Sequence, residues 1–337
     1  MENLELAIQE IKEAMPGLTL LEHEPMSGHC SFRIGGPARA LAVPRDITGL
    51  TQICYLLKKH ELAPYILGNG TNILFPDEGL KDLFLISTEK LDKLFLLPDG
   101  AVYAEAGVSL SKLATFAQQN GLAGLEFASG IPGTVGGGLM MNAGAYGGEL
   151  KDAVESVVIN FLPEQALYEL TNEQCQFGYR TSLFQKMPGC VIVSAVFRLK
   201  AGDGEEIAAK MRELNARRRE KQPLDLPSAG SAFRRPEGHF AAALIDQAGL
   251  KGYCVGGARV SEKHAGFVVN TGNATSHDVY DLMMHIRKTV YEHSRVVLEP
   301  EMILLPPDYK LEDHGPQVPL HHVWGAGTEE EETAQKR

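Results

Sequence analysis

Between Gly130 and Gly148 the sequence carries eight glycines, a density that limits how this chain can fold more than any other feature. They are Gly130, Gly133, Gly136, Gly137, Gly138, Gly144, Gly147 and Gly148. So many glycines cost backbone conformational entropy, so the segment needs a compensating reason. Without Cβ atoms, successive backbone N–H groups can approach phosphate oxygens closely, which favours an anion-binding cradle. The alternative is that the glycines only form tight turns.

A shorter glycine loop, residues 68–72, follows a predicted strand at residues 65–67. Before it come a predicted strand at 38–43 and a helix that Asp46 is expected to cap. Strand, helix, strand and glycine loop is the order of a ligand-binding α/β unit. Neither loop has the G-x-G-x-x-G pattern followed by a helix and an acidic residue, so a Rossmann dinucleotide site is disfavoured. A P-loop motif is also absent from the sequence.

Charge and cysteine content narrow the function classes. A net charge of −11 argues against a nucleic-acid-binding protein, without excluding a small anionic ligand. The five cysteines are widely spaced and form no C-x-x-C, which predicts neither a metal site nor a disulfide framework and favours a reducing compartment. The acidic N-terminus does not resemble a signal peptide, and the apolar runs are strand-sized. We therefore expect a cytoplasmic protein without membrane insertion.

The pattern along the chain predicts three domains and a tail. Residues 1–95 and 96–202 form the first two, the second being rich in strands and containing a helix that Ser109 caps. A third domain is expected over residues 203–308, starting with a helix capped by Asp203 and including a second helix at about 276–293. Residues 309–337 are polar and are expected to be disordered.

At this point the sequence resembles a known family. Residues 124–148 closely resemble the signature of the UDP-N-acetylenolpyruvoylglucosamine reductase (MurB) family. Five other segments match that family in the same order: 31–38, 68–72, 177–180, 228–233 and 298–301. The short interval between Arg180 and Ser231 resembles the shorter class of the family, which lacks an inserted tyrosine-bearing loop over the substrate.

The resemblance implies an α+β fold: a two-subdomain FAD-binding fold of the vanillyl-alcohol-oxidase (PCMH) type, followed by a C-terminal α+β substrate domain whose end returns to the flavin. It implies non-covalent FAD, with NADPH as hydride donor. The reaction would reduce the enolpyruvyl ether of UDP-N-acetylglucosamine to UDP-N-acetylmuramate for peptidoglycan. UDP-N-acetylenolpyruvoylglucosamine and NADPH are the expected partners, with no nucleic acid, and a monomer is expected.

The same resemblance assigns three catalytic residues. Arg180 would stabilise the charge that develops on the substrate, because a fixed cation at that place is a large catalytic effect. Ser231 would protonate C2 of the substrate, and Glu301 matches the family's active-site glutamate. Residue type alone predicts none of these roles: such residues are more often surface, loop or strand-end residues.

The predicted binding residues fall into two sets. The FAD set comprises Gly68, Asn69, Gly70, Thr71, Asn72, Ser129, Gly130, Ile131, Pro132, Gly133, Thr134, Gly136, Gly137, Asn142, Ala143 and Gly144. The substrate set comprises Tyr179, Arg234, Lys263 and His264. The sequence departs from the family at Arg235, where the family commonly has asparagine, and at Cys30, where it often has threonine.

Two rival functions remain open. One is an oxidase of the same fold acting on alcohols or sugars. Such enzymes often carry a histidine in the first phosphate loop for covalent flavin attachment, and residues 68–72 contain none. The other is a non-catalytic module that binds a flavin or a nucleotide sugar.

Overall fold

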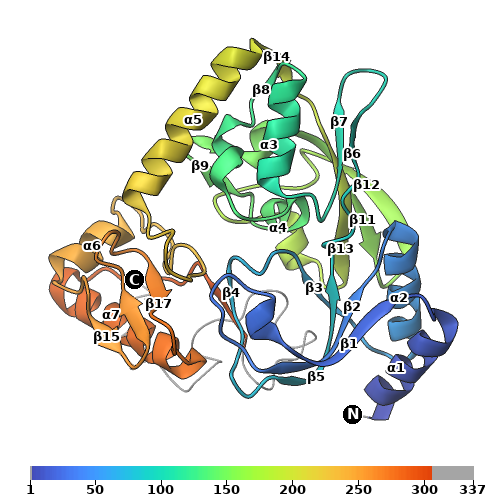
Figure 1. Ribbon diagram of the computed structural model, residues 1–337, viewed down its shortest axis with the longest axis horizontal. Coiled ribbons are helices and arrows are strands. Elements are labelled where there is room, and N and C mark those ends of the chain that lie inside the picture. Colours follow the sequence, from blue (N-terminus) through green and yellow to red (C-terminus); the bar gives the residue numbers. More distant parts are fainter. Residues whose placement is uncertain (1, 306–337) are drawn as a thin grey trace.

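A computed structural model describes residues 2–305, which form three packed regions (Figure 1). The predicted polar tail at 309–337, and the last residues of the predicted third domain, lie outside the described residues.

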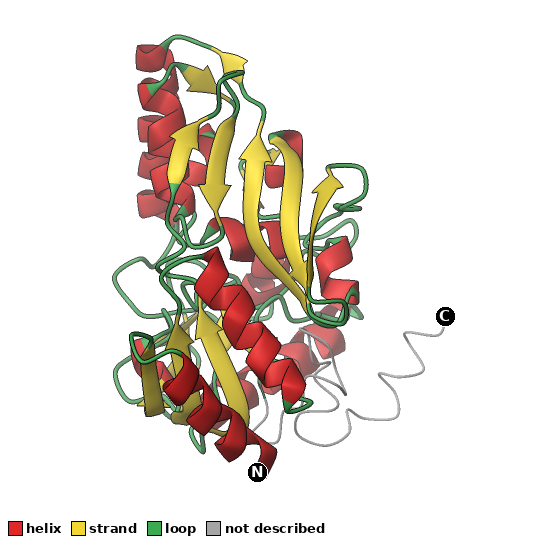
Figure 2. Ribbon diagram, turned by 90° about the vertical axis from the view of Figure 1, so that its right-hand side faces the viewer, coloured by secondary structure: helices red, strands yellow, loops and turns green. Residues whose placement is uncertain are grey.

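The first region is a four-stranded sheet with two helices on one face. Its elements are α1 (Glu2–Ala14), β1 (Thr19–Pro25), β2 (Pro37–Val43), α2 (Ile47–Lys59), β3 (Tyr65–Leu67) and β5 (Leu80–Ser87), with the strand order β1-β2-β5-β3. Figure 2 shows both helices lying on one face of this sheet. Alternate side chains of the strands face the helices, and Ala40, Phe84 and Ile86 join a core with residues of α1 and α2. The predicted cap is confirmed: Asp46 accepts a hydrogen bond from Gly49 N at 2.8 Å.

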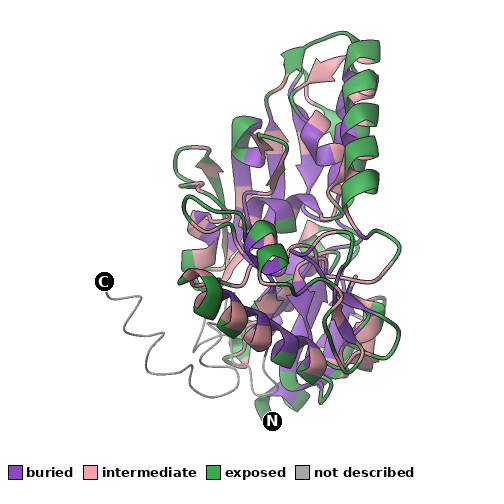
Figure 3. Ribbon diagram, turned by 90° about the vertical axis from the view of Figure 1, so that its left-hand side faces the viewer, coloured by how far each residue is buried: buried purple, intermediate pink, exposed green. Residues whose placement is uncertain are grey.

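The second region is built on a five-stranded antiparallel sheet. Its main elements are β6 (Leu94–Leu96), β7 (Val102–Glu105), α3 (Leu110–Gln119), β11 (Val154–Phe161), β12 (Ala166–Thr171) and β13 (Cys190–Phe197), in the order β12-β11-β13-β7-β6. Ser109 caps α3 as predicted, accepting from Lys112 N at 3.1 Å. The buried strands of both sheets appear in Figure 3.

Part of the glycine segment is helical, which the sequence analysis did not predict. Residues Val135–Met140 form the short helix α4. Three consecutive glycines have low helix propensity, so the pattern indicated a loop. Thr134 nevertheless caps the helix by accepting from Gly137 N at 3.3 Å, and Val135 and Leu139 bury its inner face.

Helix α5 (Gly204–Lys221) packs on the second region, although the sequence analysis placed it in the third. Asp203 caps it as predicted, and Leu214 is buried in the core of the second region. In Figure 1 the helix runs beside α3. Its surface is mostly polar, so the sequence pattern gave no sign of the region that its few apolar residues contact.

The third region contains α6 (Ala241–Gln247), β15 (Cys254–Val255), β16 (Ala258–Val260), β17 (Val268–Asn270) and α7 (Ser276–Ser294). Helix α7 confirms the predicted helix and begins at a capping box formed by Thr275 and Asp278. Strand β18 (Ile303–Leu304) then pairs in parallel with β4 (Ile73–Leu74) of the first region. This pairing brings the segment around Glu301 back beside the first glycine loop.

The remaining short elements are β8 (Leu122–Ala123), β9 (Gly144–Ala145), β10 (Gly148–Glu149), β14 (Lys200–Ala201), and the 3-10 helices η1 (Met26–Gly28), η2 (Glu126–Gly130), η3 (Leu150–Asp152) and η4 (Leu183–Lys186).

Candidate active site

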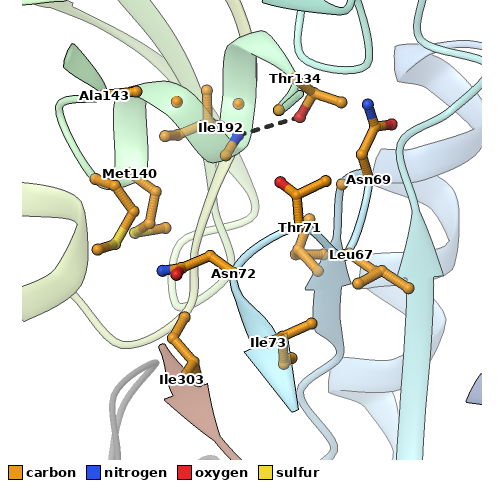
Figure 4. A pocket seen from close by; sticks show the side chains of 18 of the residues that line it. Leu67, Asn69, Thr71, Asn72, Ile73, Thr134, Met140, Ala143, Ile192 and Ile303 are labelled. Atoms are coloured by element: carbon orange, nitrogen blue, oxygen red, sulfur yellow. Dashed lines mark hydrogen bonds between the residues drawn. The ribbon is translucent and has the colours of Figure 1, made fainter. Parts of the chain in front are cut away.

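The two glycine loops of the sequence contact each other in space. Asn69 Nδ2 donates to the Pro132 carbonyl at 3.0 Å. A Cβ on Gly68 would lie 2.6 Å from Thr134 Oγ1, so only glycine allows this approach. Figure 4 shows Asn69, Thr71 and Thr134 gathered around one hollow, with Asn72 and Ile303 below them.

That hollow is a cavity of about 370 Å³, within the usual range for small-molecule sites. It is bordered by segments from all three regions. From the predicted FAD set, the lining includes Gly68–Asn72, Ile131–Thr134, Gly136, Gly137, Ala143 and Gly144. The three predicted catalytic residues, Arg180, Ser231 and Glu301, line the same cavity.

The glycines of the second loop serve two different purposes. At Gly136, Gly138 and Gly144 an added Cβ would come within 3.0 Å of other protein atoms, so these glycines allow close packing within the protein. At Gly133 and Gly137 the nearest protein atoms would be 3.8 and 3.5 Å away. Protein packing does not require glycine at these two cavity-lining positions, whereas close approach of a ligand to the backbone does.

Backbone donors remain available in both loops. Within residues 2–305, the backbone N–H groups of Asn69, Gly70, Thr71 and Gly133 donate to no protein acceptor. Gly70 has a φ of 57°, and successive donors around such a residue form a concave surface suited to an anion. The loops therefore meet the electrostatic requirement for binding phosphate oxygens.

Arg180 is presented by a tight turn. Residues 178–181 form it, with Thr181 N donating to Gly178 O at 3.3 Å and Gly178 N donating to Thr181 O at 2.9 Å. Arg180 has a φ of 53°, in the left-handed region. Its Nε lies 2.6 Å from Glu301 Oε1, and its Nη2 donates to Gly144 O at 3.0 Å. The guanidinium is thus fixed between the second glycine loop and the returning C-terminal segment.

Ser231 and Glu301 lie on neighbouring extended segments. Glu301 N donates to Ala232 O at 3.0 Å, and Asn72 Nδ2 donates to Glu301 O at 3.1 Å. In the described part of the chain the Ser231 hydroxyl has no protein hydrogen-bond partner, so it can donate to a ligand in the cavity.

Arg218, on the last turns of α5, is a lining residue that the sequence analysis did not identify. It borders both the main cavity and an adjoining hollow of about 610 Å³. Burial lowers the pKa of its guanidinium, and no carboxylate of residues 2–305 forms a salt bridge with it. The run Arg217–Arg219 signals positive charge at a helix end, but the sequence cannot tell which side chain points inward.

The four predicted substrate residues lie outside the lining of the main cavity. Tyr179 is exposed on the turn beside Arg180, and its hydroxyl accepts from Arg235 N at 3.3 Å. Lys263 Nζ donates to Arg219 O at 2.6 Å, and Arg234 N donates to Glu299 O at 2.8 Å.

The environment of His264 favours the neutral form of its imidazole. Burial lowers the pKa of its imidazole, and Gly266 N donates to Nδ1 at 3.2 Å, which leaves the ring proton on Nε2. In this form it could offer a substrate a hydrogen bond from Nε2, but no charge.

Three predicted FAD residues also lie outside the lining: Ser129, Gly130 and Asn142. Ser129 Oγ donates to Glu126 O at 2.9 Å. A Cβ on Gly130 would lie 2.5 Å from Asn215 Oδ1, so this glycine accommodates α5. Asn142 is completely buried and bonds to protein only. These residues were predicted because they belong to the segment that resembles the family signature, in which lining and non-lining residues are interspersed along the chain.

Residues 2–305 contain neither a candidate metal site nor a candidate membrane-spanning helix. No group of three or more histidine, cysteine, aspartate or glutamate residues there could hold a metal ion. None of the helices in that range combines the length and apolar character needed to cross a bilayer.

Comparison with known proteins identifies the family. Residues 38–161 match the family described as FAD binding domain, and residues 222–305 match the one described as UDP-N-acetylenolpyruvoylglucosamine reductase, C-terminal domain. The UDP-N-acetylenolpyruvoylglucosamine reductase of Caldanaerobacter subterraneus subsp. tengcongensis is 47% identical over 300 residues, which are 88% of this chain and 97% of that protein. The chain belongs to the UDP-N-acetylenolpyruvoylglucosamine reductase family.

Two other members of the reductase family are similar to this chain over most of its length. The Clostridioides difficile reductase is 45% identical over 285 residues, covering 85% of this chain and 93% of that protein. The crystal structure of the Thermus caldophilus reductase superposes with a TM-score of 0.72 at 33% identity, covering 86% of this chain and 99% of that one. The predicted α+β, FAD-binding fold is therefore confirmed.

The residues present fit FAD. The glycine loops offer backbone N–H groups that, like the Arg218 guanidinium of α5, bond to no acceptor within residues 2–305 and can receive a pyrophosphate. Apolar residues such as Leu67, Ile192 and Ile303 offer surface to the rings.

Gly68→Ala is expected to weaken FAD binding, because its Cβ would push against Thr134 Oγ1 and separate the loops. The strain should cost about 1–3 kcal/mol, measurable as a roughly tenfold or larger rise in the Kd for FAD. Gly17→Ala is the control, because no atom lies within 4 Å of a Cβ there. In a Thr134→Ala background the effect of Gly68→Ala should shrink. An undiminished effect would show that contact with Thr134 is not its cause.

Proposed function

We propose that this reductase catalyses the NADPH-dependent, FAD-mediated reduction of UDP-N-acetylenolpyruvoylglucosamine to UDP-N-acetylmuramate, a step in peptidoglycan synthesis. The names of its relatives and the matched FAD-binding domain support the proposal. The observation that carries it is the Arg180–Glu301 ion pair, which lines the same cavity as Ser231 and both glycine loops. We further propose that the protein acts in the cytoplasm as a monomer.

The glycine loops would hold FAD, which would carry hydride from NADPH and supply it to C3 of the enolpyruvyl group. Negative charge then spreads from C2 to the substrate carboxylate. Arg180 is a fixed cation, already oriented by Glu301 and Gly144, so it can stabilise this charge without reorganising. Glu301 thus orients the guanidinium.

Ser231 completes the reaction by giving its hydroxyl proton to C2. A carbanionic carbon is basic enough to accept a proton from a hydroxyl, and the serine then regains a proton from solvent. With hydride at C3 and a proton at C2, the double bond is reduced and the charge balances. We propose that the UDP moiety contacts Tyr179, whose hydroxyl accepts from Arg235 N, and extends toward the third region, which carries Arg234, Lys263 and His264.

Single-turnover kinetics test the proposal. The FAD-loaded enzyme is reduced with NADPH without oxygen and mixed with UDP-N-acetylenolpyruvoylglucosamine. The flavin absorbance should return and one equivalent of UDP-N-acetylmuramate should form. If the reduced flavin stays reduced with this substrate, the proposed reaction is wrong.

The same preparation separates the two rival functions. Acid precipitation should release the flavin, whereas an oxidase with covalent attachment would retain it on the chain. A non-catalytic module would bind FAD but never oxidise NADPH in the presence of the substrate.

We also propose that Arg218 binds the FAD pyrophosphate. Arg218→Met keeps the length of the side chain but removes its charge, so the Kd for FAD should rise about tenfold to a hundredfold. Arg212→Met, at an exposed position of the same helix, is the matched control. If the Kd for FAD stays unchanged while the KM for the UDP substrate rises, the guanidinium serves the substrate instead.

A further inference from the structure

The turn that carries Arg180 is held through its backbone by two amide side chains, those of the buried Asn142 and the half-buried Gln185. Asn142 Nδ2 donates to the carbonyl of Gly178 at 2.9 Å. Gln185 Nε2 lies 3.2 Å from the carbonyl of Arg180 itself. The Asn142 amide is therefore hydrogen-bonded to the turn two residues before Arg180, and the Gln185 amide is hydrogen-bonded to the Arg180 carbonyl itself.

Asn142 has no capacity left for a ligand. It is 0% exposed, and its Nδ2 also approaches Glu149 Oε2 at 3.2 Å. Its Oδ1 accepts from Lys151 N at 3.0 Å. Both amide hydrogens and the amide oxygen are thus engaged with protein. The residue has a φ of 42°, a conformation that asparagine tolerates better than most residues.

Gln185 connects the turn to the end of α4. Besides approaching Arg180 O, its Nε2 donates to Met140 O at 2.8 Å. Ser182 Oγ donates to the same Met140 carbonyl at 2.7 Å. Residues 140–142 and 178–185 are therefore joined at several points, with the cavity-lining Met140 in one segment and Arg180 in the other.

We propose that Asn142 and Gln185 are positioning residues that hold the Arg180 guanidinium where the substrate carboxylate will lie. This inference rests on the proposed function, in which Arg180 stabilises that charge. Arg180 occupies a left-handed backbone conformation that is unfavourable for arginine, so neighbouring contacts must maintain it. Two amide-to-carbonyl hydrogen bonds, one on each side of the strained residue, provide that support.

Asn142→Gly tests the hydrogen bond to the Gly178 carbonyl, and Gln185→Met tests the one to the Arg180 carbonyl. Glycine removes the side chain and still accepts the left-handed backbone, while methionine keeps the size of glutamine but cannot donate. In each variant we expect reoxidation of the reduced flavin by the substrate to slow about 10- to 100-fold, because misplacing a catalytic group by about an ångström has effects of that size. Reduction of the flavin by NADPH should change less than about twofold, since Arg180 stabilises charge on the other substrate.

Asn172→Ala is the matched control. Asn172 Nδ2 also joins two backbone carbonyls, those of Lys151 and Val154, at 2.8 and 2.7 Å, but it does not contact the turn. Its loss should lower the melting temperature without changing the ratio of the two half-reaction rates. A similar change of that ratio in Asn172→Ala would mean that general loosening is the cause, and would overturn the proposal.

A double-mutant cycle gives the decisive result. If Asn142 acts only through Arg180, adding Asn142→Gly to Arg180→Met should slow flavin reoxidation by no more than about threefold beyond Arg180→Met alone. Additive losses would overturn the proposal. If Asn142→Gly does not fold, Gln185→Met enters the same cycle.

Crystal structures of the variants separate this inference from the proposed function. The 178–181 turn and the Arg180 guanidinium should be displaced in Asn142→Gly and Gln185→Met whether or not the UDP substrate is the right one. An undisplaced turn would refute the positioning role. Failure of the wild-type reduced enzyme to react with the substrate would instead refute the proposed function.

Discussion

Ser231→Ala is expected to stop product formation while NADPH still reduces the bound flavin at close to the wild-type rate. The reason is that the Ser231 hydroxyl lines the cavity, has no hydrogen-bond partner among the residues that the structure describes, and is the proposed proton donor to C2. Loss of a general acid lowers rates by about 10²- to 10⁴-fold. Rapid mixing of the pre-reduced variant with substrate measures the effect directly, because only the second half-reaction needs this proton.

The control is a serine of similar size and a purely local role. Ser294 Oγ donates to Val290 O at 2.8 Å at the end of α7, so Ser294→Ala should leave both half-reactions unchanged. A Ser231→Ala enzyme that forms product at nearly the wild-type rate would show that the proton comes from another group. A solvent isotope effect on the wild-type second half-reaction, lost in the variant, would strengthen the assignment.

Arg180→Met is expected to lower the rate of flavin reoxidation by about 10²- to 10³-fold, because it removes the fixed cation facing the developing charge. Arg180→Lys should recover only part of this loss. Lysine keeps the charge but cannot bond Glu301 and Gly144 together in the observed geometry. Single-turnover rates with saturating substrate measure both variants.

Arg198→Met is the matched control for this loss of charge. Arg198 forms ion pairs with Glu155 and Asp99 on the surface, where such pairs contribute about 0–1 kcal/mol to stability. It should therefore leave the kinetics unchanged. Equal rate losses in Arg198→Met and Arg180→Met would show that net charge, and not the cation in the cavity, governs the reaction.

Local signals in the sequence predicted local structure well. Asp46, Ser109 and Asp203 each cap the helix that follows them, because a cap depends only on neighbouring residues. Helix α4 was not predicted, because its glycines have low helix propensity. Its stability comes from the Thr134 cap and from the burial of Val135 and Leu139. The region on which α5 packs was not predicted either, because the residues that α5 contacts are remote from it in sequence.

In the candidate site too, motifs were predicted from the sequence, whereas the direction of individual side chains was not. The three proposed catalytic residues followed from resemblance to a family, and the structure brings all three to one cavity. Arg218 was missed because nothing in an arginine run shows which side chain turns inward. The family signature predicts Asn142 as a flavin contact, yet its side chain is buried and bonds to the protein.

The pairing of β18 with β4 determines how late in synthesis the cavity can be completed. Asn72 and Glu301 are 229 residues apart in the chain, yet they share a hydrogen bond at the cavity. Contacts between such distant positions close large loops, so they form slowly and late in folding. The two glycine loops emerge early from the ribosome, but Glu301, which pairs with Arg180, emerges only after nearly all of the described chain. A ribosome-bound chain that stops before Glu301 should therefore contain both glycine loops and still lack the proposed reductase activity.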